Sequence, residues 1–144
     1  MISFSFNNIE KPAFDEAKTA VWLRAVAAKH SRKIGNVSYV FCNDNEILEI
    51  NRQFLQHDYF TDIITFDNST GSTLNGDIFI SIDTVKSNAE EYGKQFENEL
   101  KRVIVHGILH LCGQNDKTEI EATQMRKKED EALEICIKIG DIQE

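Results

Sequence analysis

The segment that most constrains this chain is 105–116, which reads VHGILHLCGQND. His106 and His110 are four residues apart, so on a helix both project from the same face, about 6 Å apart. Gly113 follows the second histidine by three residues and can end the helix in a left-handed turn. The chain can then fold back and bring Asp116 to the two imidazoles. This pattern predicts a metal centre with three protein ligands and one open position, as in catalytic zinc sites.

A purely structural interpretation of the same segment stays open. Pairs of histidines at this spacing are common on helices, and two hydrogen-bonded imidazoles could mark a buried helix end that Asp116 caps. Cys112 is two residues from His110 and points to a different helix face, so it is left out of the metal site. Together with Cys42 and Cys136 it is expected to be a buried, small apolar residue in a reducing cytoplasm.

Length and composition are those of an ordinary one-domain protein. The 144 residues are 41% hydrophobic and 28% charged, which predicts a single domain over residues 1–144. No apolar run approaches the roughly 20 residues that cross a bilayer, and the N-terminus lacks the features of a signal peptide. We therefore expect a cytoplasmic protein without a membrane partner. The net charge of −8 argues against a non-specific nucleic-acid binder.

The periodicity of apolar residues predicts an α+β fold. Alternating patterns predict strands over residues 2–6, 34–42, 61–66 and 76–82. Helical spacing and capping signals predict helices that start at Pro12, after a capping box at Asn43, near Asp83, near Phe96 and after a capping box at Thr118. The polar stretch 68–73 is expected to form a loop. This order predicts one mixed four-stranded sheet covered by helices.

Four motifs occur in order along the chain: TDIITF at 61–66, GDI at 76–78, HGILHLCG at 106–113 and EATQM at 121–125. Together they resemble the YbeY family of bacterial endoribonucleases over essentially the whole chain. The resemblance implies a zincin-like α+β fold and a zinc-dependent endonuclease that cuts single-stranded RNA. It also implies a role in maturing the 3′ end of 16S ribosomal RNA and in ribosome quality control, with the small ribosomal subunit as partner and no DNA substrate.

The resemblance assigns His106, His110 and Asp116 as metal ligands and catalytic residues, with one Zn²⁺ per chain. Nickel or cobalt would also suit this mixture of nitrogen and oxygen donors. The family usually has a third histidine where this chain has Asp116, and a carboxylate is a competent zinc ligand. Because the carboxylate lowers the net charge of the site, we expect a weaker Lewis acid and a higher pH optimum than in a three-histidine relative.

A second departure concerns an arginine that the family usually has shortly before the strand at 61–66. The matching position in this chain is Leu55, which cannot replace a guanidinium. Arg52, about one helical turn earlier, and His57, in the following loop, are candidates for substrate binding in its place. His57 is equally well explained as an exposed loop histidine.

Cations near the metal would favour a phosphate backbone. Lys101 and Arg102 lie about one turn before His106, and Lys117 follows the acidic ligand, so these three are candidate substrate-binding residues. The basic run 126–128 is better explained as a solvated face that pairs with the acidic residues after it.

Two other functions remain as alternatives. The spacing of the histidines and the aspartate also occurs in short zinc proteases, but Gly107 stands where the protease motif carries its glutamate base. The other alternative is a non-catalytic, ribosome-associated factor that keeps the metal for stability, which the missing family arginine favours.

Overall fold

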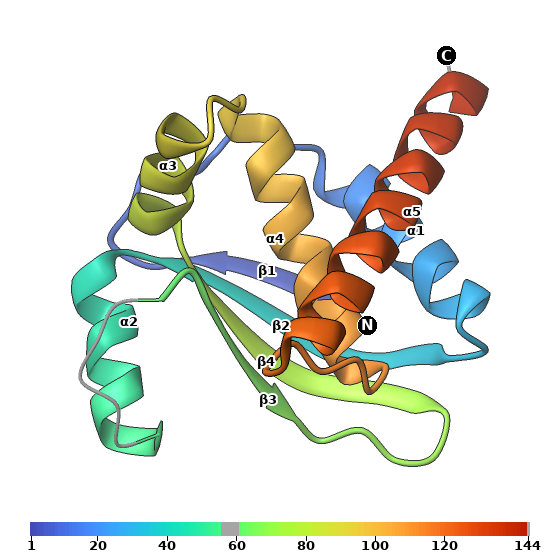
Figure 1. The fold of residues 1–144 in the computed structure, drawn as a ribbon, viewed down its shortest axis with the longest axis horizontal. Coiled ribbons are helices and arrows are strands. Elements are labelled where there is room, and N and C mark those ends of the chain that lie inside the picture. Colours follow the sequence, from blue (N-terminus) through green and yellow to red (C-terminus); the bar gives the residue numbers. More distant parts are fainter. Residues whose placement is uncertain (56–60, 144) are drawn as a thin grey trace.

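The computed structural model describes residues 1–55 and 61–143, and Figure 1 shows their arrangement. The elements are, in chain order, β1 (Ile2–Phe6), α1 (Glu16–Lys29), β2 (Lys33–Cys42), α2 (Asp44–Ile50), a π-helical turn η1 (Asn51–Leu55), β3 (Ile63–Asp67), β4 (Thr73–Ser81), α3 (Ile82–Glu91), α4 (Phe96–Leu111) and α5 (Glu119–Gln143).

The four strands form one mixed sheet in the order β1-β2-β4-β3. β1, β2 and β4 run parallel, while β3 pairs antiparallel with β4 and forms one edge. This confirms the predicted α+β class and the predicted mixed four-stranded sheet. Along the described chain, no helix is both long enough and apolar enough to cross a membrane.

Helix α4 lies across one face of the sheet, with α1 and α5 beside it (Figure 1). The core between them contains the fully buried side chains of Tyr39, Ile78 and Ile80. Gly107 allows the close approach, because a Cβ atom at this position would lie 2.8 Å from Cδ1 of Ile78. The histidine-bearing helix is therefore seated directly on the sheet.

Helix α2 covers part of the opposite face. Its Ile47 is buried against Cys42 of β2 and Ile64 of β3, in a small cluster separate from the main core. Successive residues of β3 thus face different layers, since Ile63 lies beneath α4 and Ile64 beneath α2.

Two predicted boundaries are wrong. α1 begins at Glu16 rather than Pro12, because Asp15 is its N-cap and accepts a hydrogen bond from Lys18 N at 3.0 Å. β4 begins at Thr73, three residues earlier than expected, since pairing with β2 extends it into the polar stretch that was expected to be a loop.

Both predicted capping signals start helices. Thr118 and Glu121 form the full reciprocal box, with both hydrogen bonds at 3.1 Å. Asn43 accepts from Glu46 N at 2.9 Å, but the Glu46 carboxylate accepts from Asn8 instead of returning to the cap. The three cysteines are free; Cys42 is buried as expected, whereas Cys112 and Cys136 are only partly buried.

Candidate metal centre

The predicted three-residue group is built by one helix and the turn that follows it. His106 and His110 project from the last two turns of α4. Gly113 has φ +96°, a left-handed conformation that glycine adopts at little cost, and its N–H donates to the His110 carbonyl at 2.9 Å. The chain then reverses and carries Asp116 back to the histidines. One ligand atom from each of the three side chains lies within 4.8 Å of the other two.

The distances suit a single ion of the size of zinc. Oδ2 of Asp116 lies 3.2 Å from Nε2 of His106 and 3.5 Å from Nε2 of His110. With metal–ligand bonds of 2.0–2.2 Å, two ligands of a tetrahedral ion are about 3.4 Å apart. The two ring planes are 81° apart, so the imidazoles approach the aspartate from different directions. The geometry and the nitrogen and oxygen donors fit a zinc-type ion.

The other ring nitrogen of each histidine has its own partner. Nδ1 of His106 lies 2.5 Å from Oε2 of Glu129, and Nδ1 of His110 lies 2.9 Å from the carbonyl oxygen of Gln114. Both partners are acceptors, so each Nδ1 carries a hydrogen and each Nε2 can present its lone pair to a cation. Partners of this kind orient metal-binding histidines and fix their tautomer.

Glu129 is the functional residue that sequence reasoning missed. It comes from α5, is 5% exposed, and contacts His106 across the α4–α5 interface. Arg102 donates to Oε1 of Glu129 at 2.8 Å and to Oδ1 of Asp130 at 2.7 Å. The sequence pattern predicts that Glu129 lies on a solvated face, because it follows a basic run. Its position four residues after the buried Met125, on the same helical face, is the signal that could have found it.

His106 and Glu129 each stabilise the charged form of the other. Burial alone lowers the pKa of His106, but the hydrogen bond and charge of Glu129, with the charges of Asp116 and Asp62, outweigh burial and raise that pKa. Burial alone raises the pKa of Glu129, but His106 and Arg102 outweigh it and lower that pKa. This pair is therefore favoured in its charged form when no metal is bound.

His110 behaves differently from His106. Burial and the charge of the neighbouring His106 lower the pKa of His110, which outweighs the attraction of Asp116. The neutral imidazole that a metal requires is thus favoured at His110, whereas a proton must leave His106 before a metal binds.

The candidate substrate-binding residues fall in different places. Lys117 lies beside His110 and Asp116 in one groove of about 480 Å³. Arg102 is engaged behind the centre by Glu129 and Asp130. Arg52 belongs to the exposed face of η1, whose Asn51 and Leu55 line the groove. His57 lies outside the described residues.

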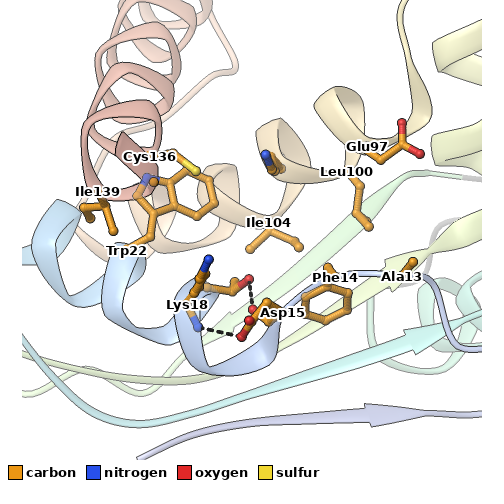
Figure 2. A pocket seen from close by; sticks show the side chains of 13 residues that line it. Ala13, Phe14, Asp15, Lys18, Trp22, Glu97, Leu100, Ile104, Cys136 and Ile139 are labelled. Carbon is orange, nitrogen blue, oxygen red and sulfur yellow. Dashed lines mark hydrogen bonds between the residues drawn. The ribbon is translucent and has the colours of Figure 1, made fainter. Parts of the chain in front are cut away.

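Lys101 lies at a second cavity, of about 370 Å³, between α1, α4 and α5. Figure 2 shows apolar side chains in its lining, among them Trp22, Phe14 and Ile104, together with the charged side chains of Lys18 and Glu97. No residue of the three-ligand group lines this cavity, so the structure brings Lys117, but not Lys101, next to the metal centre.

The fold and the site together define a class of protein: an α+β domain in which a helix on a mixed sheet carries two histidines that, with an aspartate after the helix, could hold a metal ion. Residues 4–136 match the family model described as Endoribonuclease YbeY. The chain belongs to this family.

Relatives and a solved structure agree with this assignment. The chain is 50% identical over 133 residues to an Endoribonuclease YbeY of Phocaeicola vulgatus, covering 92% of this chain and 96% of the relative. It is 48% identical over 132 residues to one of Bacteroides thetaiotaomicron, with the same coverage. The solution structure of TM1509 from Thermotoga maritima is similar with a TM-score of 0.65 and 27% identity, over 94% of this chain and 89% of that one.

Proposed function

We propose that this protein is a metal-dependent endoribonuclease that cuts single-stranded RNA, with Zn²⁺ held by His106, His110 and Asp116. The observation that carries the proposal is the arrangement of the two imidazoles. Each Nδ1 is hydrogen-bonded to an acceptor, and each Nε2 lies within 3.5 Å of one carboxylate oxygen of Asp116. Membership of the Endoribonuclease YbeY family supports RNA as the substrate.

A bound zinc ion supplies Lewis acidity to a phosphoryl oxygen and makes a water more acidic. The residues of the chain hold that ion and set the charge around it. Asp116 contributes one negative charge, and Glu129 a second one through its hydrogen bond to His106. Lys117 adds a positive charge to the groove in which a phosphate would lie. Gly107 is buried against Ile78 and can move no proton, so α4 offers no base at the position that zinc proteases use.

We further propose that the RNA is the 3′ region of 16S ribosomal RNA on the small ribosomal subunit, and that residues 1–144 act as one domain in the cytoplasm. The family membership supports this substrate. The absence of a side-chain base at Gly107 weighs against the protease alternative.

The test compares three substrates with the purified, zinc-loaded protein: single-stranded RNA, duplex RNA and casein. We expect cleavage of single-stranded RNA alone, loss of cleavage with a chelator, and recovery when zinc is restored. His110→Ala should lower the rate at least about 100-fold, because it removes a ligand. The matched control is His30→Ala, at the end of α1 and outside the three-ligand group, which should retain cleavage.

Other outcomes would overturn the proposal. Chelator-sensitive hydrolysis of casein would support the protease alternative. Stoichiometric zinc without cleavage of any RNA substrate would support the non-catalytic, ribosome-associated factor.

A further inference from the structure

The groove beside the candidate metal centre follows β3, an edge strand whose outer side pairs with no other strand among the described residues. β3 is an edge strand in the order β1-β2-β4-β3. Its Ile63, Thr65 and Asp67 line the groove of about 480 Å³ that also contains His110 and Asp116. The open strand edge and the metal centre therefore share one surface.

The register of β3 shows which of its main-chain groups point away from β4. Ser81 N donates to Asp62 O at one end of the strand, and Asn68 N donates to Asn75 O just beyond the other end, both at 2.9 Å. Antiparallel partners alternate between hydrogen-bonded and non-hydrogen-bonded pairs. Even-numbered residues of this stretch therefore bond to β4. The N–H and C=O groups of the odd-numbered residues 63, 65 and 67 point away from β4, and of these the Ile63 carbonyl accepts a hydrogen bond from Oγ1 of Thr61 at 3.4 Å.

A side-chain hydroxyl on the same strand is also unpaired among the described residues. Oγ1 of Thr65 is buried and makes no hydrogen bond among the described residues. Buried hydroxyl groups are nearly always hydrogen-bonded, so this one is available to bond to a water or a ligand. Thr65 lies midway along the open edge, between Ile63 and Asp67.

The charge of the groove indicates which part of an RNA chain faces the strand. Lys117 is the basic residue among its described lining, while Asp67 and Asp116 are acidic. Such a surface favours phosphates only at the metal centre and at the lysine. Along the rest of the edge, alternating donors and acceptors suit the hydrogen-bonding edges of bases and ribose hydroxyl groups.

We propose that single-stranded RNA docks in an extended conformation along the β3 edge, with bases or riboses hydrogen-bonded to the main chain of residues 63, 65 and 67, and one phosphate at His110 and Asp116. This rests on the proposed endoribonuclease function. Outward-pointing groups repeat about every 6.8 Å along a strand, a step comparable to one nucleotide of an extended single strand. A duplex has its base edges paired, so the proposal accounts for a single-strand preference through geometry.

The most direct test records amide NMR spectra of the zinc-loaded protein during titration with a single-stranded RNA hexamer. Phosphorothioate linkages slow its cleavage, and a gel checks its integrity afterwards. We expect the amide signals of Ile63, Thr65 and Asp67 to shift strongly, while those of Ile64 and Phe66, which donate to β4, move little. A duplex of the same sequence should produce no alternating pattern.

Two substitutions at Thr65 distinguish the contribution of its main-chain N–H to RNA binding from that of its hydroxyl. Thr65→Pro removes an outward N–H that the sheet does not use, a change that edge strands tolerate. Thr65→Val removes only the hydroxyl and keeps the N–H. We expect Thr65→Pro to raise KM for single-stranded RNA roughly three- to tenfold above the KM of Thr65→Val, with zinc affinity unchanged in both variants.

The results distinguish this inference from the proposed function. If the native protein cuts RNA but the amide shifts do not alternate and the two variants have equal KM values, the docking edge is wrong and the function stands. If the native protein cuts no RNA, the function itself fails. If an extended peptide, and not RNA, shifts the same three amides, the edge binds peptide and the proposal is overturned. Should Thr65→Pro not fold, the amide pattern alone decides.

Discussion

Replacing Glu129 by glutamine tests the link between α5 and the metal centre. The Glu129 carboxylate accepts from His106 with one oxygen and from Arg102 with the other, at 2.5 and 2.8 Å. Glutamine has the same shape but a single acceptor oxygen, so one of these two contacts must be lost. A hydrogen bond to a charged group contributes about 1.5–3 kcal/mol. Arg102 keeps Asp130 as a second partner, so we expect Glu129→Gln to lower the free energy of unfolding by about 1–2 kcal/mol.

The larger effect should be on the metal. Loss of a hydrogen-bonding partner of a metal-binding histidine weakens metal affinity about 10- to 100-fold. Zinc affinity is measured by competition with a chromophoric chelator, and stability by urea unfolding of the metal-free protein. The matched control is Asp130→Asn, which removes the negative charge of the exposed partner of Arg102 and should cost below about 1 kcal/mol while leaving zinc affinity within about twofold. Unchanged zinc affinity in Glu129→Gln would refute a role for α5 in orienting His106.

Three further predictions follow from the same geometry. Because His106 has a raised pKa and must lose its proton to bind metal, zinc affinity measured by chelator competition should fall as the pH decreases through that pKa; constant affinity between pH 8 and 5 would contradict this. In the metal-free protein the lowered pKa of Glu129 stabilises the fold above the unfolded pKa of about 4.3, and this stability is lost as the pH falls through the lower, folded pKa. Urea unfolding of Glu129→Gln at a series of pH values should lack this acid-dependent loss. If the stability of the native protein and the variant changes in parallel with pH, the contribution of Glu129 is contradicted. Gly76→Ala would place a Cβ atom 2.4 Å from the Phe66 carbonyl oxygen across the β3–β4 pair. We therefore expect the free energy of unfolding, measured with urea, to fall by about 2–3 kcal/mol. A decrease below about 0.5 kcal/mol would show that β3 moves away freely.

Asp116 also sets an expectation for activity. If its carboxylate weakens the Lewis acidity of the bound ion, Asp116→His should shift the optimum of the pH–rate profile for RNA cleavage to lower pH. Identical profiles for the native and variant proteins would contradict this effect of the carboxylate.

The three-residue group could be predicted because its geometry is local. His106 and His110 need only one helix, and Gly113 turns the chain within three residues. The partner of His106 could not be found in this way, because Glu129 is 23 residues away and reaches it only through the packing of α5 on α4. Arg102 shows the same effect, since it lies one turn before His106 and therefore meets the same glutamate rather than a substrate phosphate.

The order of the strands in the sheet could not be predicted from local sequence patterns either. Alternating apolar residues predicted the strands, but the position of β3 at an edge depends on β4 inserting between it and β2. The predicted start of α1 was wrong because Pro12 and Asp15 both suit the beginning of a helix. The hydrogen bond from Lys18 N to the Asp15 side chain places the start after Asp15.

The most direct test of the account is anomalous X-ray diffraction at the zinc edge from crystals of protein purified without added metal or chelator. We predict one anomalous peak per chain, about 2.0–2.2 Å from Nε2 of His106, Nε2 of His110 and an oxygen of Asp116. A crystal with no ion at these three side chains, or with an ion that leaves Asp116 uncoordinated, would contradict it.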